Sequence, residues 1–189
     1  LELFHEREVR QPANVPQKLN TPEGVYHDFW QAVACGVQGI QVFSHSHLKD
    51  HPAMPANLES YRRATRQFTE EGIGRVALYG APVSGIECRV IEGPERTVSF
   101  RPLPRFKDKD EVAEVSFPAI NIMAKTHGGV CYLVAVNSTE ERVKAAVSGL
   151  PVAAGSATVL FREVETPIEK NSVVLEFSPL GVNVLKIRM

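Results

Sequence analysis

The hydrophobic periodicity changes part-way along the chain, and this change restricts the possible folds more than any other feature. In the first part, apolar residues recur at helical spacing, as in Val25, Phe29 and Val33. In the second part, short apolar segments alternate with turn residues at the spacing of an all-β domain. We therefore predict an α+β chain, with an α/β segment at 1–80 and an antiparallel β-sandwich domain at 84–189.

The first segment has the order strand, helix, strand, helix. Strand-like stretches at 1–4 and 39–44 each precede a predicted helix, one capped by Thr21 with a proline at its first position and one capped by Asn57. This order is typical of a right-handed parallel βα array. Two βα units are too few for a closed domain, because parallel strands are normally buried on both faces. The segment is therefore interpreted as the end of a partial barrel or sheet, whose exposed strand edges and helix faces need a partner.

The second segment contains eight strand candidates separated by turn signals and, at 102–111, by a predicted loop. The candidates lie at 86–91, 96–101, 119–125, 130–136, 142–147, 157–162, 172–177 and 181–187.

Composition excludes several classes of protein. The 189 residues are 43% hydrophobic and 23% charged, and 21 basic and 22 acidic residues leave a net charge of −1. These values argue against a disordered or membrane-spanning chain and against nucleic-acid binding. Three cysteines far apart in sequence do not form a disulfide framework, so buried thiols are expected. The compartment stays open, although this cysteine use favours the reducing cytoplasm.

Several stretches together resemble the C-terminal part of a clan A glycoside hydrolase, with β-galactosidase family 42 as the nearest likeness. The resemblance implies the last βα units of a TIM barrel followed by a terminal β-sandwich. The stretches that carry it are 11–16 with 20–24, 29–43, 134–139 and 177–182.

The resemblance implies a retaining mechanism with two carboxylates about 5 Å apart. The nucleophile position at the end of the seventh barrel strand would correspond to Glu2, Glu6 or Glu8, and spacing to Asn14 does not choose among them. Glu2 lies within the predicted strand and Glu6 just past it, so these two are the candidates. His5 lies beside these carboxylates and, like Asn14, is a candidate substrate-binding residue. The Asn-Glu pair that would supply the acid/base has no counterpart in the sequence.

The second candidate region follows the strand at 39–44. Phe43 is a candidate for stacking on a sugar, and His45 and His47 are candidates for substrate binding, because a barrel carries its site at this edge. Two alternatives stay open for the histidines: a solvated loop without a role, and a zinc site with Asp50. No further ligand cluster lies nearby, so no metal and no cofactor are expected.

Other singled-out residues receive structural interpretations. Trp30 is expected in the core, His27 exposed or capping, and Arg62, Arg63 and Arg66 on a solvated helix face. The sequence lacks a Gly-x-Ser-x-Gly elbow, which disfavours a serine hydrolase.

Three functions remain open at this point. In the first, the chain is the C-terminal fragment of a glycoside hydrolase and is active only if the acid/base comes from elsewhere. Alternatively, it is a non-catalytic carbohydrate-binding or structural module, or a truncated protein with unrelated, esterase-like hydrolase activity. The expected partners are carbohydrate and either a second copy of the chain or a missing N-terminal barrel chain.

Overall fold

The computed structural model describes residues 21–37, 39–40, 52–102 and 112–189. Its helices are α1 (Pro22–Ala34), α3 (Met54–Glu70) and α4 (Ile73–Tyr79). Its strands are β1 (Ala81–Pro82), β2 (Glu87–Glu92), β3 (Arg96–Pro102), β4 (Val112–Pro118), β5 (Ile120–His127), β6 (Val130–Asn137), β7 (Val143–Ser148), β8 (Ala154–Val159), β9 (Val164–Glu169), β10 (Val173–Phe177) and β11 (Val182–Arg188).

Helix α1 begins as the sequence predicts. The hydroxyl of Thr21 accepts a hydrogen bond from the backbone N–H of Gly24 at 3.1 Å, and Pro22 occupies the first helical position. A proline costs nothing there because the first-turn N–H groups have no partner within the helix. The predicted N-cap is confirmed.

Helix α3 begins earlier than predicted. Its N-cap is Ala53, and Pro55 lies in the first turn. Asn57 is therefore not the cap: it is buried within the helix, and its N–H donates to the carbonyl of Ala53 at 3.1 Å. Gly72, with φ 75°, ends the helix as expected and opens α4, which the sequence did not predict.

The strands form two facing antiparallel sheets. The larger sheet has the order β1-β5-β6-β11-β8-β9, and the smaller has the order β10-β7-β2. Alternate residues of the two sheets fill one core between them; its fully buried side chains include Leu133, Ala145 and Leu185. The antiparallel sheet predicted for the second part of the chain is confirmed.

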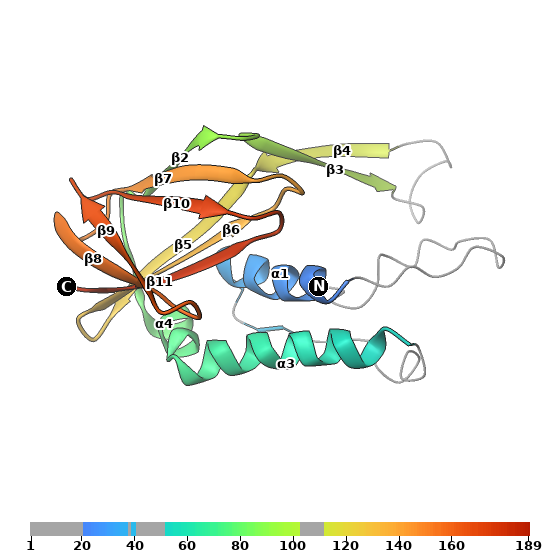
Figure 1. Cartoon of the computed structure of the whole chain (residues 1–189), viewed down its shortest axis with the longest axis horizontal. Helices are drawn as coiled ribbons and strands as arrows, with labels where there is room; N and C mark the ends of the chain where they lie inside the picture. The colour runs from blue at the N-terminus through green and yellow to red at the C-terminus, as the bar shows by residue number, and fades with distance from the viewer. Residues whose placement is uncertain (1–20, 38, 41–51, 103–111) are drawn as a thin grey trace.

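A second core lies on the opposite face of the larger sheet, where the helices pack (Figure 1). Trp30 and Phe29 from α1 meet Val134 and Val136 from β6 there. Strand β6 is thus buried on both faces, which explains its nearly continuous apolar sequence. Trp30 is 0% exposed, so its expected core position is confirmed.

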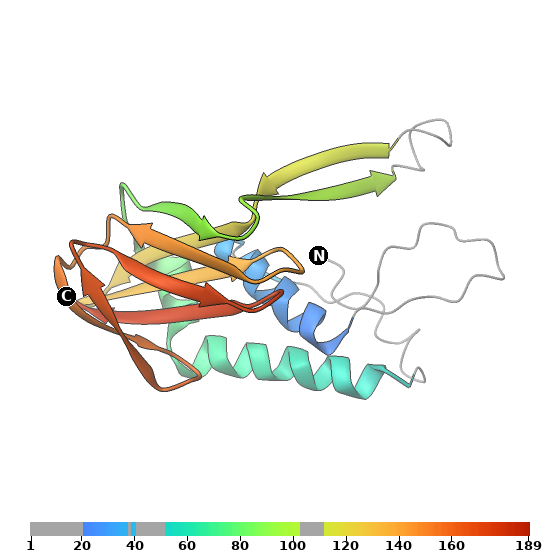
Figure 2. The same ribbon diagram turned by 45° about the horizontal axis from the view of Figure 1, so that its top comes forward.

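Strands β3 and β4 form a separate two-stranded ribbon, paired from Arg96–Pro118 to Pro102–Val112. Figures 1 and 2 show that the ribbon extends beyond both sheets, toward the end of the molecule where α1 and α3 begin.

Two interpretations of individual side chains are wrong. His27 is buried rather than exposed, because the sheet and α3 cover α1 on two sides; its Nδ1 lies 3.1 Å from Oδ1 of Asp28. Cys35 is exposed rather than buried, because it is the C-cap residue of α1. Cys131 is buried as expected.

The predicted parallel strands fall mainly outside the described residues. The stretch at 1–4 lies wholly outside them; Gly39 and Ile40 are described and are not in a strand. The partial barrel and the division into 1–80 and 84–189 therefore stay predictions. The described helices nevertheless share a core with the sheet.

Candidate functional site at the helix N-termini

Helices α1 and α3 are parallel neighbours. Successive contacts run in the same direction along both: Pro22 with Ser60, Tyr26 with Gln67, and Trp30 with Phe68. Both helices therefore begin at the same end of the molecule (Figure 1).

Small residues on one stripe of α3 allow this close approach. Asn57, Ser60 and Ala64 follow one another at helical spacing and are all buried. The hydroxyl of Ser60 donates to the carbonyl oxygen of Pro22 at 2.5 Å, which joins the first turn of α1 to α3. The stripe is visible in the sequence, where it is the signal that α3 packs closely against another helix.

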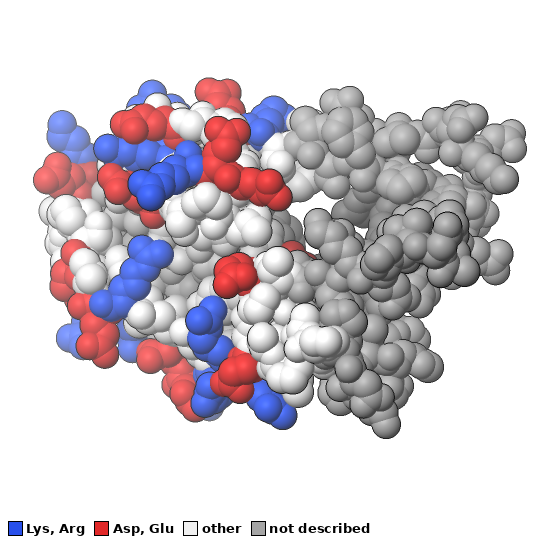
Figure 3. All heavy atoms as spheres, turned by 45° about the vertical axis from the view of Figure 1, so that its right-hand side comes forward, with Lys and Arg blue, Asp and Glu red and all other residues white. Residues whose placement is uncertain are grey.

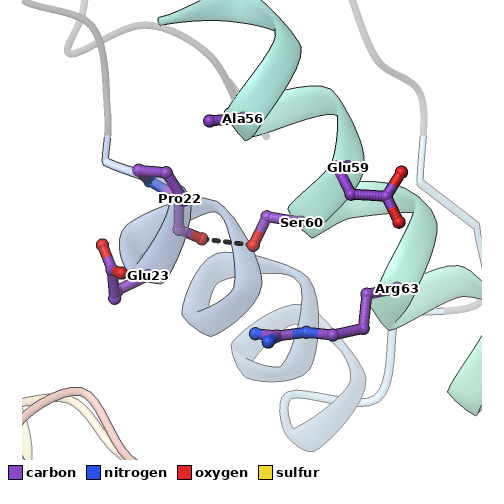
Figure 4. A pocket seen from close by; sticks show the side chains of 6 residues that line it. All are labelled: Pro22, Glu23, Ala56, Glu59, Ser60 and Arg63. Carbon is purple, nitrogen blue, oxygen red and sulfur yellow. Dashed lines mark hydrogen bonds between the residues drawn. The ribbon is translucent and has the colours of Figure 1, made fainter.

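A pocket of about 320 Å³ lies at this junction (Figure 4). Pro22 and Glu23 line it from α1, and Ala56, Glu59, Ser60 and Arg63 line it from α3.

The charged side chains of this pocket have different surroundings. Oε1 of Glu59 lies 2.9 Å from Nη2 of Arg66, and its Oε2 lies 4.0 Å from Nη1 of Arg62, both on the exposed face of α3. This exposed pairing confirms the solvated face expected for Arg62 and Arg66.

Arg63 differs from its two neighbours. Its side chain extends toward α1 (Figure 4), where the guanidinium carbon lies 4.2 Å from the centre of the Tyr26 ring. Burial raises the pKa of the Tyr26 hydroxyl, and the positive charge of Arg63 opposes this shift. The Tyr26 hydroxyl donates to Gln67 at 2.8 Å.

The chemical groups of this pocket are the carboxylates of Glu23 and Glu59, the guanidinium of Arg63 and the apolar side chains of Pro22 and Ala56. The hydroxyl of Ser60 is already committed to the Pro22 carbonyl. Within the described ranges, no group of three or more His, Cys, Asp or Glu side chains could hold a metal ion. None of the described helices has the length and hydrophobicity to cross a lipid bilayer.

The sequence-predicted site residues all lie outside the described residues. These residues are Glu2, His5, Glu6, Asn14, Phe43, His45 and His47. The first four precede Thr21, which caps α1, and the last three precede Ala53, which caps α3. Their arrangement stays a prediction, whereas the pocket beside the two helix starts was not predicted.

One face of the described part of the chain carries mixed charge. Figure 3 shows acidic and basic side chains interspersed over the described part of one face.

Comparison with known proteins defines the fold. No protein-family model matches the sequence, and no curated protein matches it. The fold is similar to part of an α-amylase. With the α-amylase from Geobacillus thermoleovorans, solved in complex with acarbose, the TM-score is 0.52 at 10% identity, covering 90% of this chain and 34% of that chain.

Two other solved structures match at lower TM-scores. A family 27 β-L-arabinopyranosidase from Geobacillus stearothermophilus gives 0.49 at 11% identity, covering 94% of this chain and 33% of that chain. A putative α-N-acetylgalactosaminidase from Bacillus halodurans gives 0.48 at 13% identity, covering 96% of this chain and 36% of that chain. The chain thus spans about a third of the length of these glycoside hydrolases, and the likeness concerns the fold alone.

Proposed function

We propose that this chain is the C-terminal part of a glycoside hydrolase, in which α1 and α3 belong to the last two βα units of a barrel. The observation that carries the proposal is the parallel packing of α1 and α3 on one face of the larger sheet.

Parallel neighbouring helices constrain the segment between them. In the proposed array, the chain returns from the end of α1 to the start of α3, a distance close to the length of α1, about 20 Å at the helical rise of 1.5 Å per residue. A β-strand covers that distance in about six residues. In a βα array, a strand of this kind connects the end of one helix to the start of the next parallel helix. The predicted strand at 39–44 has this length and position in the sequence.

The same topology indicates at which end of the proposed barrel a substrate would bind. In a βα barrel, the substrate site lies where the strands end and the helices begin. The pocket between Pro22 and Arg63 lies at the start of α1 and beside the first half of α3, and the segments that carry the predicted site residues precede those helices in the sequence. The fold likeness to an α-amylase supports a carbohydrate as the ligand of this edge.

In the proposed mechanism, Glu2 or Glu6 attacks the anomeric carbon as the glycosidic bond breaks and the acid/base protonates the leaving oxygen; water then hydrolyses the covalent glycosyl-enzyme intermediate and restores the carboxylate. His5, Asn14, Phe43, His45 and His47 bind the sugar. The acid/base carboxylate comes from a part of the protein outside these 189 residues. Assignment to a β-galactosidase of family 42 belongs to the proposal and rests on the sequence resemblance.

A mechanism-based label tests the nucleophile without the acid/base. A 2-deoxy-2-fluoroglycoside with a dinitrophenyl leaving group needs no proton donor, and its fluorine slows hydrolysis of the covalent intermediate. We expect mass spectrometry to find one glycosyl group on Glu2 or Glu6, and the corresponding Glu2→Gln or Glu6→Gln variant to remain unlabelled. Glu70→Gln, an exposed residue in the last turn of α3 that lines neither pocket, is the control and should label normally. Labelling that survives in the double Glu2→Gln/Glu6→Gln variant, or no labelling at all, would contradict the nucleophile assignment.

A non-catalytic module is the second candidate. Among the described residues, the pocket at the helix N-termini contains carboxylate and guanidinium groups suited to binding, and its Ser60 hydroxyl is committed to the Pro22 carbonyl. This candidate predicts that the chain binds oligosaccharides saturably. The substitution Arg63→Gln should weaken this binding, whereas Glu2→Gln and Glu6→Gln should leave it unchanged.

A further inference from the structure

A second pocket, of about 410 Å³, lies among three loops of the sandwich. Arg142 ends the β6–β7 loop, Ser178 begins the β10–β11 loop, and Arg162 lies at the tip of the β8–β9 hairpin. This pocket shares no lining residue with the pocket at the helix N-termini, so an inference from it is independent of the proposed function.

Three positive and two negative side chains line this pocket. Nζ of Lys144 lies 3.6 Å from Oε1 of Glu92 and 3.8 Å from Oε1 of Glu176, in a row across the smaller sheet. Arg142 and Arg162 form no ion pair with any described residue. Because Lys144 faces two carboxylates, this row keeps one negative charge, and the two guanidinium groups leave the lining as a whole with a net charge of +1.

Hydrogen bonds and ring packing hold the loops that carry these groups in place. Asn137 holds the β6–β7 loop to the β10–β11 loop through hydrogen bonds from its amide nitrogen to the carbonyls of Glu141, at 2.8 Å, and Ser178, at 2.9 Å. The β8–β9 tip is anchored by Phe161, whose ring lies 5.7 Å from that of Trp30.

Two of these three loops, β8–β9 and β10–β11, contain residues with a strained backbone conformation. The described residues include five non-glycine residues with positive φ, and three of them are Phe161, at 70°, Glu163, at 54°, and Leu180, at 52°. Such conformations cost about 1–3 kcal/mol each and cluster at ligand sites, where the surrounding structure enforces them. Phe161 and Glu163 flank Arg162, so the strained turn fixes the position of its backbone.

We propose that this pocket binds an oxyanion, namely the carboxylate, sulfate or phosphate group of a ligand. A guanidinium presents two parallel N–H donors that match the two oxygens of such a group. Ser178 also lines the pocket, on the β10–β11 side. The fixed loops leave little conformational entropy to lose on binding.

Titration calorimetry tests the proposal with sodium sulfate as the probe and sodium chloride holding the ionic strength constant. We expect saturable binding of sulfate that falls about tenfold in Arg142→Gln and in Arg162→Gln, and that is lost in the double variant. Both arginines are exposed, so these substitutions leave the cores intact. Arg75→Gln, an exposed arginine on α4, is the matched control and should bind sulfate as the parent chain does.

Two further ligands distinguish the source of the oxyanion. Tighter binding of oligogalacturonate than of sulfate, with no binding of a neutral maltooligosaccharide, assigns the pocket to an acidic saccharide. Equal binding of oligogalacturonate and sulfate assigns it to an isolated oxyanion. Absence of saturable binding by either anion, or binding that the double variant retains, overturns the proposal.

Discussion

The side-chain amide of Asn137 donates a hydrogen bond to the carbonyl oxygen of Ser178 at 2.9 Å and thereby joins the end of β6 to the turn before β11. Its carbonyl oxygen accepts from both the N–H and the hydroxyl of Thr139, at 3.0 and 2.8 Å. Asn137 is 0% exposed, so every polar atom of its side chain is satisfied within the protein. The two sandwich stretches of the family resemblance, 134–139 and 177–182, are therefore two halves of one polar network.

Replacing Asn137 by alanine should lower the free energy of unfolding by about 2 kcal/mol, because a buried side chain loses its hydrogen bonds to Thr139, Glu141 and Ser178. Asn121→Ala is the matched control: Asn121 also donates two hydrogen bonds, to Pro118 and Ser138, but it is half-buried and water can replace them. Its cost should stay below about 1 kcal/mol. Urea unfolding of both variants measures the difference, and equal costs would show that burial of the network contributes nothing.

The sequence predicted those parts of the fold that leave a local pattern. The Thr21 cap and most strands of the two sheets are found within a few residues of their expected positions. Strand β9 was missed because Pro167 interrupts its pattern, which an edge strand tolerates. Helix α4 was missed because Gly72 and Gly74 surround its start. Strand β8 was placed too late, since its first residues are exposed.

The pockets could not be predicted because they join residues that are distant in the sequence. Pro22 meets Ser60 only after α1 and α3 pack, and Arg142 and Arg162 share a pocket only after three loops converge. No local spacing encodes either meeting. The predicted catalytic and sugar-binding residues, by contrast, came from the family resemblance and lie outside the described residues.

Gly149 and Gly129 provide a matched test of backbone approach. Both have φ values near 80°, so an alanine at either position carries similar left-handed strain, about 1–2 kcal/mol. A Cβ at Gly129 would meet no atom within 4 Å, whereas one at Gly149 would collide with the backbone carbonyl of Gly85. Gly149→Ala should therefore cost at least about 2 kcal/mol more than Gly129→Ala, since overpacking adds to the strain. Thermal unfolding compares them, and similar melting temperatures would contradict the close approach.

At Phe161, the glycine variant should be more stable than the alanine variant. Alanine removes the ring from Trp30 but keeps the strained φ of 70°, whereas glycine removes both the ring and the strain. We expect Phe161→Ala to be about 1 kcal/mol less stable than Phe161→Gly. At Val174, an exposed residue of strand β10, the order should reverse, because glycine weakens an extended strand. Chemical denaturation of the four variants gives both differences; the same order at both positions would exclude the strain.

The pH dependence of stability should reveal the buried thiol of Cys131. Burial raises the pKa of Cys131 from 9.0 to about 11, because the thiolate cannot be solvated in the core between the sheets. The group therefore stabilises the folded state fully below pH 9, where the thiol is protonated in both states. Between pH 9 and 11 the unfolded chain loses this proton while the folded chain keeps it, so the free energy of unfolding falls with rising pH.

The expected loss is about 2 kcal/mol by pH 11, from 1.36 kcal/mol per unit of pKa difference. Cys131→Ala is the reference, because it shares all the other groups that titrate in this range, including Cys88. Urea unfolding followed by the fluorescence of Trp30 should show the parent chain losing about 2 kcal/mol more than the variant between pH 8 and 11. Parallel pH profiles for the two proteins would mean that Cys131 ionises equally easily in the folded and unfolded chains.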